Sequence, residues 1–267
     1  MRPVWTALLV YLVAVVTVLG LQLAAVTALV GWRGSIEAER DALVTLLAGV
    51  PASSLALIAI AFVAGGRPSS LTLRLRRGRI DGRGLAIVVL GTLALSQALE
   101  SLTILLGVGP GPALDWIART MADAPPIGVL LAVLVVGLLA PVGEELFFRG
   151  YLQTRLRRTW SPGPAIVVTA LAFGVIHGEP IHGVLAFALG LFLGLLTERA
   201  ESVVPAIICH AANNSVSVVV SAWVGSPESV GANAAILLAS APVVVAAIWW
   251  MTRYRGRSRS DVRACPE

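Results

Sequence analysis

Four polar side chains in the second half of this chain could take part in chemistry: Glu144, His177, His210 and Asn214. A carboxylate and an imidazole can take up and return a proton near neutral pH, as general acid–base catalysis demands. Proton transfer is therefore the chemistry that these residue types favour.

The spacing of the polar residues places several of them on common helix faces. His210 and Asn214 are four residues apart, so both side chains project from one face of a helix. Glu145 and Arg149 have the same spacing, in the Glu-before-Arg order that favours an ion pair, and we expect this pair to form. Because adjacent helical residues point about 100° apart, Glu144 is left free to face the interior of a helix bundle.

The composition indicates that these residues lie in a membrane. Hydrophobic residues make up 57% of the chain and charged residues only 13%, and the mean hydropathy is +0.86. An ionisable residue inside a spanning helix costs roughly 2.5–3.5 kcal/mol on insertion scales, so it is seldom incidental. Glu144, Glu145 and Arg149 follow the uninterrupted apolar stretch 127–142, and we therefore expect them to be functional.

The apolar stretches predict an all-α, polytopic membrane protein with about eight transmembrane helices. A spanning helix needs about 20 apolar residues, and the candidates are 4–30, 42–64, 84–107, 127–148, 164–177, 181–196, 203–224 and 232–251. The fifth and sixth are short and meet at residues 178–180, in a tight turn or a partly re-entrant segment. We expect a single transmembrane domain over residues 1–252, a motif-bearing core at about 126–224, and a short basic cytoplasmic tail over 253–267.

The arginines predict the orientation of the chain. All 20 basic residues are arginine, and with eight spans 17 of them fall on one side; Arg33, Arg40 and Arg119 are the exceptions. The positive-inside rule then places both termini in the cytoplasm. Basic residues in such loops indicate contact with anionic lipid head groups, and the pattern does not favour nucleic-acid binding.

Helix geometry predicts that Glu144 and His177 lie at one height in the membrane. Each residue is 16 or 17 positions from Trp160, which begins the turn between the fourth and fifth spans. At 1.5 Å per residue, antiparallel helices would place both residues roughly 24–26 Å from that turn. His182, beside Pro180, belongs to no motif, and we expect it to be an ordinary residue at the edge of a loop.

Three motifs in this order resemble the CAAX protease and bacteriocin-processing (CPBP, or Abi) family, which includes the eukaryotic prenyl-protein endopeptidases. They are Glu-Glu-x-x-x-Arg at 144–149, Phe-x-x-x-His at 173–177 and His-x-x-x-Asn at 210–214. The resemblance covers residues 141–214, and the first hundred residues carry no comparable signature. The predicted eight-helix arrangement agrees with it.

The resemblance implies intramembrane hydrolysis of a peptide bond by an endopeptidase. Glu144 and His177 would activate water, while His210 and Asn214 would hold the oxyanion. Glu145, Arg149 and Phe173 would support the site. These roles imply no cofactor and a peptide or membrane-protein substrate.

A zinc-dependent protease is the first alternative. Two histidines and a carboxylate form a common catalytic zinc site, and His177, His210 and Glu144 could supply these ligands. The chain lacks the His-Glu-x-x-His signature of many zinc proteases, and Asn214 is a better oxyanion donor than zinc ligand. Ligand preferences therefore favour the metal-free mechanism.

Two further alternatives involve no catalysis. Intramembrane Glu, His and Arg also form proton relays, so a proton-coupled transport protein is possible chemically, although we find no paired halves in the sequence. Some relatives are assigned a bacteriocin-immunity role, which a non-catalytic scaffold could fill. The arginine-only, Ala/Val/Gly-rich composition is typical of a high-GC bacterium, where prenylated CAAX proteins are not expected. We therefore expect a bacterial inner membrane location, and the sequence leaves the substrate and the oligomeric state open.

Overall fold

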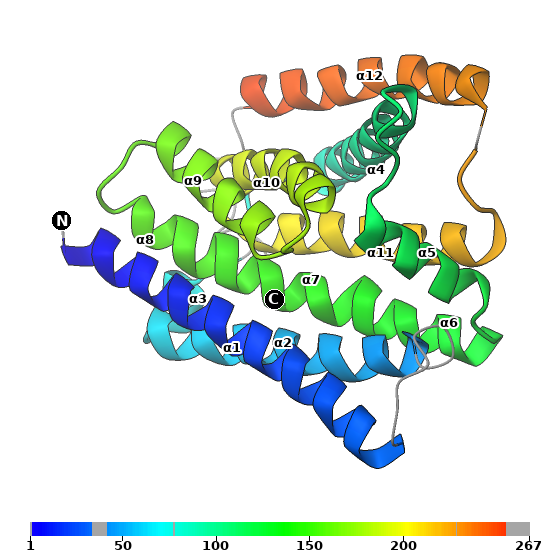
Figure 1. Ribbon diagram of the computed structural model, residues 1–267. Helices are drawn as coiled ribbons and strands as arrows, with labels where there is room; N and C mark the ends of the chain where they lie inside the picture. The colour runs from blue at the N-terminus through cyan, green and yellow to red at the C-terminus, as the bar shows by residue number, and fades with distance from the viewer. Residues whose placement is uncertain (1, 34–41, 77, 228, 255–267) are drawn as a thin grey trace.

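The computed structural model describes residues 2–33, 42–76, 78–227 and 229–254. Within these ranges the chain forms helices and no strand, which confirms the predicted all-α class (Figure 1). The elements in order are α1 (Arg2–Arg33), α2 (Ala42–Gly65), α3 (Ser69–Thr72), α4 (Gly82–Leu105), α5 (Pro112–Ala122), α6 (Pro126–Ala132), η1 (Val133–Leu139), α7 (Ala140–Glu145), η2 (Leu146–Gln153), α8 (Thr154–Leu156), α9 (Pro162–Val175), α10 (Pro180–Ala200), α11 (Val204–Trp223) and α12 (Val230–Arg253).

Seven helical stretches among the described residues are long and apolar enough to cross a membrane. They coincide with seven of the eight predicted spans and are Val4–Gly31, Ala42–Gly65, Gly82–Leu105, Pro126–Leu156, Pro180–Ala200, Val204–Trp223 and Val230–Arg253. The remaining predicted span falls on α9, whose 14 residues are shorter than the roughly 20 that a full crossing requires. The chain is an all-α polytopic membrane protein, and the count of eight stays a prediction.

The outer surface of the helices confirms that lipid is their solvent. Leu9 on α1 is 62% exposed, Val63 on α2 is 83% exposed and Leu238 on α12 is 74% exposed. Such large apolar side chains, distributed over several faces of long helices, would be costly in water at about 25 cal/mol per Å². A helix that is hydrophobic all round belongs in a membrane or a large core.

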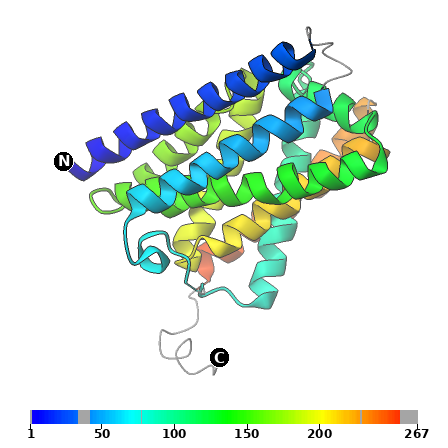
Figure 2. The same cartoon turned by 90° about the horizontal axis from the view of Figure 1, so that it is seen from below.

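The longest candidate span, Pro126–Leu156, is a continuous helical rod that contains two π-helical segments. Two π-helical segments, η1 and η2, flank the single α-helical stretch α7. In Figure 2 this rod runs beside α2, and α1 lies on the other side of α2. The close approach of α2 and α7 depends on Gly143, because a Cβ there would lie 2.7 Å from the Ser54 carbonyl oxygen.

An aromatic cluster joins η2 to α9. The Phe148 ring lies edge-on to the rings of Phe147 and Phe173, with both centroids 5.1 Å away. The hydroxyl of Tyr11 on α1 donates to the Ala172 carbonyl oxygen at 2.9 Å. These contacts fix the depth of α9 against the rod, and thereby the height of the histidine that follows α9.

Helices α9 and α10 pack against each other as a hairpin (Figure 1). The turn between them is short, and Glu179 begins α10 by accepting hydrogen bonds from the backbone N–H groups of Ile181 and His182 at 2.9 and 2.8 Å. The turn therefore fixes the start of α10 against the end of α9. The placement of both chain termini on one side of the membrane stays a prediction.

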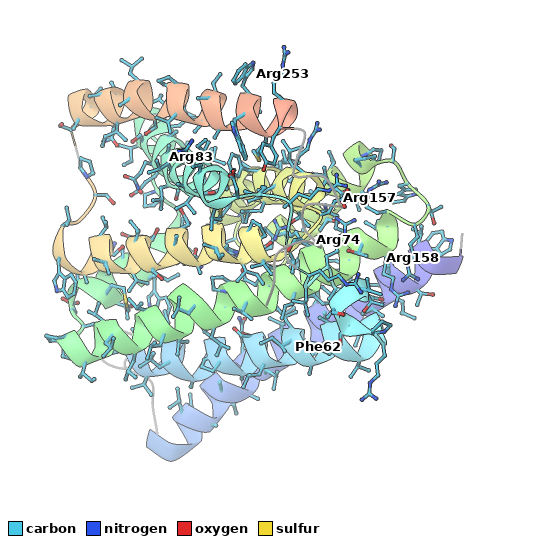
Figure 3. The ribbon with its side chains drawn as sticks, turned by 180° about the vertical axis from the view of Figure 1, so that it is seen from behind. Phe62, Arg74, Arg83, Arg157, Arg158 and Arg253 are labelled. Carbon is cyan, nitrogen blue, oxygen red and sulfur yellow. The ribbon has the colours of Figure 1, made fainter. Side chains whose placement is uncertain are left out.

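Arginines gather toward one end of the bundle. Figure 3 shows Arg74, Arg157, Arg158 and Arg253 toward the same end of the molecule, although they come from distant parts of the sequence. Arg40 and the predicted tail residues 255–267 lie outside the described residues. The grouping agrees with the sequence pattern from which the orientation is predicted.

The orientation gives a first testable prediction. A reporter that is active only in the cytoplasm, fused after Glu267, should be active, because the arginine-rich end is predicted to face the cytoplasm. The same reporter inserted after Gly225, in the connection between α11 and α12, should be silent. Activity at residue 225 together with silence at the C-terminus would reverse the predicted orientation.

Candidate active site

The acidic motif lies at the junction of α7 and η2. Glu144 and Glu145 are the last residues of α7, and Arg149 follows in the first turn of η2. The Glu145 and Arg149 side chains are fully buried, whereas the Glu144 side chain keeps 22% exposure. The two glutamates therefore have different environments, and Glu144 is the one that a substrate or water molecule can reach.

Glu145 is the centre of a buried ionic network. Its Oε1 accepts hydrogen bonds from Arg149 Nη1 at 2.7 Å and from His210 Nδ1 at 2.9 Å. Arg149 Nη2 also donates to the Gly190 carbonyl oxygen on α10 at 3.2 Å. A Cβ on residue 190 would lie 3.2 Å from that same guanidinium nitrogen, so the absence of a side chain makes room for the arginine. The predicted Glu145–Arg149 ion pair is confirmed.

These contacts fix the orientation of His210. A carboxylate oxygen only accepts hydrogen bonds, so Nδ1 of His210 carries the proton that is donated to Glu145. The other ring nitrogen, Nε2, lies 3.7 Å from Glu144 Oε2. His210 therefore lies between the two glutamates, with Nδ1 bound to the buried Glu145 and Nε2 directed toward the partly exposed Glu144.

The Phe173 ring brings the two motif histidines together. It lies edge-on to the His177 ring with centroids 5.0 Å apart and edge-on to the His210 ring at 5.8 Å. The Arg149 guanidinium carbon stands over the same ring, 4.5 Å from its centroid. Phe173 thus contacts three of the polar residues that the motifs single out, from three different elements.

The tautomer of His177 also follows from its hydrogen bond. His177 follows α9, and its Nδ1 lies 2.7 Å from the Phe173 carbonyl oxygen, which can only accept. Nδ1 therefore carries the proton, and Nε2 keeps a free lone pair. Among the described hydrogen bonds and ion pairs none joins Glu144 to His177, so their direct meeting stays a prediction.

Asn214 lies one turn beyond His210 on α11. Its Nδ2 donates to the Val136 carbonyl oxygen at 3.3 Å, and its Oδ1 accepts from Asn213 Nδ2 at 3.3 Å. An amide nitrogen has two N–H groups, so the bond to residue 136 leaves one donor for a ligand. The carbonyl of Val136 belongs to η1, whose π-helical backbone bonds differ from those of an α-helix.

His182 is a neighbour of the site that the motif pattern does not include. Its ring centroid lies 4.3 Å from that of His177, across the turn between α9 and α10. The sequence analysis expects an ordinary residue at the edge of a loop, whereas His182 lies in the first turn of α10, and its contact with His177 depends on how tightly the preceding turn closes. The sequence signal that could have identified His182 is its position five residues after the motif histidine His177.

The zinc alternative can be compared with these positions. Within the part of the chain that the structure describes, no three His, Cys, Asp or Glu side chains lie close enough to hold a metal ion. Glu144 and His210 approach each other, so a zinc site would need His177 to join them through a rearrangement.

Comparison with known proteins agrees with the motifs. Residues 126–216 match the family described as type II CAAX prenyl endopeptidase Rce1-like, and this range contains all seven residues discussed above as catalytic or supporting. This segment, about a third of the chain, is therefore similar to the CAAX protease family. The family segment comprises the rod from α6 to α8, the hairpin of α9 and α10, and most of α11.

The chain is also similar to a bacterial protein. It is 29% identical over 119 residues to an Escherichia coli protein named "Uncharacterized 24.3 kDa protein". The matched region is 44% of this chain and spans half the length of that relative. The activity and substrate of the whole protein are therefore matters for proposal.

Proposed function

We propose that this chain is an endopeptidase that hydrolyses a peptide bond within the membrane, without a metal. The observation that carries the proposal is the contact of one Phe173 ring with the rings of both His177 and His210, while His210 reaches toward Glu144. These contacts connect the two imidazoles and bring one of them toward the acid, and Asn214 lies one turn beyond His210 on α11. This arrangement supports acid–base chemistry better than a set of isolated interhelical hydrogen bonds would.

In the proposed reaction Glu144 and His177 activate a water molecule. One of them takes a proton from the water, and the resulting hydroxide attacks the scissile carbonyl carbon. The tetrahedral intermediate then loses its amine, which receives the proton, and the peptide C–N bond breaks. The free Nε2 lone pair of His177 and the partly exposed carboxylate of Glu144 support these roles.

His210 and Asn214 are the proposed oxyanion donors. Because Nδ1 of His210 is already bound to Glu145, donation to an oxyanion requires a second proton on Nε2. The buried carboxylate of Glu145 would stabilise the imidazolium that this produces, as a buried aspartate does in serine proteases. Asn214 would add its second N–H, and such donors are effective where water is excluded.

The setting of the site supports a proposed substrate class and a proposed location. A site within spanning helices favours an apolar peptide or a membrane protein as substrate, since it must reach Glu144 from lipid or from the helix ends. The similarity to a protein from Escherichia coli supports the proposed bacterial inner membrane. The coarser classification, an integral membrane protein of the CAAX protease family, rests on the family match and the seven apolar helices.

A chelation experiment tests the metal-free form of the proposal. The purified chain should keep its peptide-cleaving activity after dialysis against a chelator, because no step requires a metal ligand. Metal analysis of the active protein should give clearly less than one zinc per chain. Activity that is lost on chelation and restored by zinc would instead establish Glu144, His177 and His210 as candidate ligands.

A further inference from the structure

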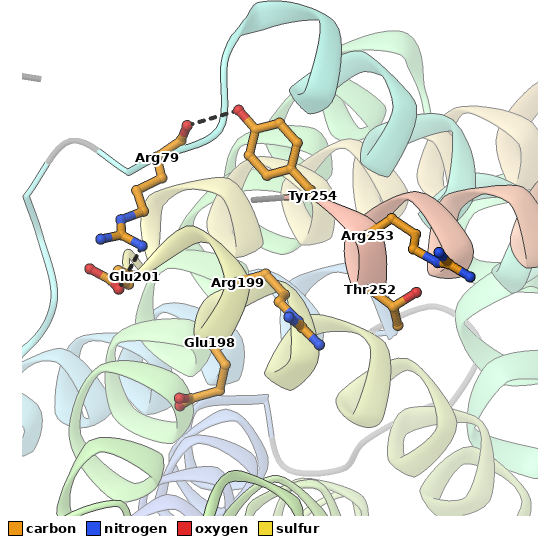
Figure 4. Close-up of a pocket in the computed structure, with 7 residues that line it drawn as sticks. All are labelled: Arg79, Glu198, Arg199, Glu201, Thr252, Arg253 and Tyr254. Carbon is orange, nitrogen blue, oxygen red and sulfur yellow. Dashed lines mark hydrogen bonds and ion pairs between the residues drawn. The ribbon is translucent and has the colours of Figure 1, made fainter. Parts of the chain in front are cut away.

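A pocket of about 630 Å³ lies at the arginine-rich end of the molecule, apart from the candidate active site. Three segments that are distant in sequence form it: the residues just before α4, the C-terminal turn of α10 and the end of α12 (Figure 4). Two hydrogen bonds between these segments fix the shape of the pocket. Arg79 N–H donates to the Ala200 carbonyl oxygen at 2.9 Å, and the Tyr254 hydroxyl donates to the Arg79 carbonyl oxygen at 3.0 Å.

Three arginines and two glutamates line this pocket. The charge of one glutamate, Glu198, is already engaged, because it accepts hydrogen bonds from Arg74 at 2.8 Å and from Arg157 at 3.0 Å. Neither of these arginines lines the pocket. The other glutamate, Glu201, pairs with Arg79 at 3.1 Å. Positive charge therefore exceeds negative charge around the cavity.

The excess charge is carried by Arg199 and Arg253, whose side chains are exposed. Among the described residues neither guanidinium takes part in an ion pair; that of Arg253 stands 5.9 Å from the Trp249 ring centroid. Figure 4 shows Arg199, Thr252 and Arg253 on one side of the pocket, away from the Arg79–Glu201 pair. Two guanidinium groups thus remain available to an outside ligand, whereas the Thr252 hydroxyl already donates to the Trp249 carbonyl oxygen at 2.8 Å.

The surroundings of the pocket indicate the membrane interface. Trp250 stacks on Tyr254 with ring centroids 4.4 Å apart, and Trp249 is 60% exposed one position earlier. Tryptophan and tyrosine gather at the level of lipid head groups. Guanidinium groups match phosphate oxygens in geometry and charge, and basic pockets between spanning helices bind anionic head groups.

We propose that this pocket binds the phosphate group of an anionic phospholipid through Arg199 and Arg253. Its volume exceeds that of one inorganic ion and leaves room for the glycerol portion of a head group. A free phosphate has the same chemistry, so the test must separate the two sources. The site is independent of the proposed peptidase reaction, and its failure would leave that reaction untouched.

The experiment measures the thermal unfolding midpoint of the detergent-purified full chain. The protein is titrated separately with dihexanoyl phosphatidylglycerol, dihexanoyl phosphatidylcholine and sodium phosphate. Phosphatidylglycerol should raise the midpoint of the unmodified protein, and phosphatidylcholine should not. In the double variant Arg199→Gln and Arg253→Gln the half-saturating concentration of phosphatidylglycerol should rise at least fivefold, since both available guanidinium groups are lost.

Arg83→Gln is the matched control. Arg83 is an exposed arginine near the start of α4 that does not line the pocket, and its replacement removes one positive charge, as each replacement in the double variant does. This variant should respond like the unmodified protein. Equal weakening by Arg83→Gln, or an unchanged response in the double variant, would overturn the proposal, as would the absence of any shift. A shift produced equally by sodium phosphate would retain the site and identify free phosphate as its ligand.

Discussion

Replacement of Glu144 by glutamine should lower the rate of peptide hydrolysis by about 10²–10⁴-fold, the usual contribution of a positioned acid–base group. The amide keeps the volume of the side chain but cannot take a proton from water. Because Glu144 is the partly exposed member of the acidic pair and lies 3.7 Å from His210, its loss should leave the buried network intact. The measurement is cleavage of a peptide by equal amounts of purified variants.

Glu100→Gln is the matched control for this variant. Glu100 is also a glutamate on a spanning helix, but it binds Ser226 near the end of α4 and lies outside the motifs. The Glu100→Gln variant should cleave the peptide at the normal rate. The thermal unfolding midpoint of Glu144→Gln should stay close to that of the unmodified protein. Near-normal cleavage by Glu144→Gln would reject Glu144 as the proposed base.

Glu145→Gln, unlike Glu144→Gln, should cause a large loss of thermal stability. Glu145 and Arg149 are both fully buried, and Glu145 also holds His210. Removing one partner of a buried ion pair leaves an uncompensated charge and costs about 3–5 kcal/mol. The unfolding midpoint should fall, and activity should fall with it because the His210 ring loses its anchor.

A double variant separates these two effects. Glu145→Leu combined with Arg149→Met removes both charges at once, and apolar replacements of similar volume are often neutral or stabilising. The double variant should recover most of the lost stability while remaining inactive, since His210 stays without its carboxylate. If Glu145→Gln is as stable as the unmodified protein, the Glu145–Arg149 ion pair has no structural role.

The helices were predictable because hydropathy depends on composition along the chain and needs no tertiary information. Seven of the eight predicted spans coincide with helices of sufficient length. The pairs within one helix were also predictable without tertiary information. His210 and Asn214 share a face of α11, and Glu145 binds Arg149 one turn away. Local spacing is sufficient for such pairs.

Contacts between helices were not predictable in this way. The hydrogen bond from His210 to Glu145 joins residues 65 positions apart, and the His177–His182 contact depends on the closure of a turn. The π-helical segments η1 and η2 also have no hydropathy signal, because an apolar run looks the same in either pitch. The short α5 was missed because it is not a spanning segment.

The origin of the oxygen in the product tests the central claim most directly. The purified chain is incubated in ¹⁸O-labelled water with tryptic peptides from bacterial membrane proteins, and new C-termini are identified by mass spectrometry. If Glu144 activates water for peptide hydrolysis, the unmodified chain should produce new C-terminal carboxylates that each contain one ¹⁸O atom, and Glu144→Gln should produce almost none. Labelled termini in equal amounts from both proteins, or from neither, would contradict the mechanism.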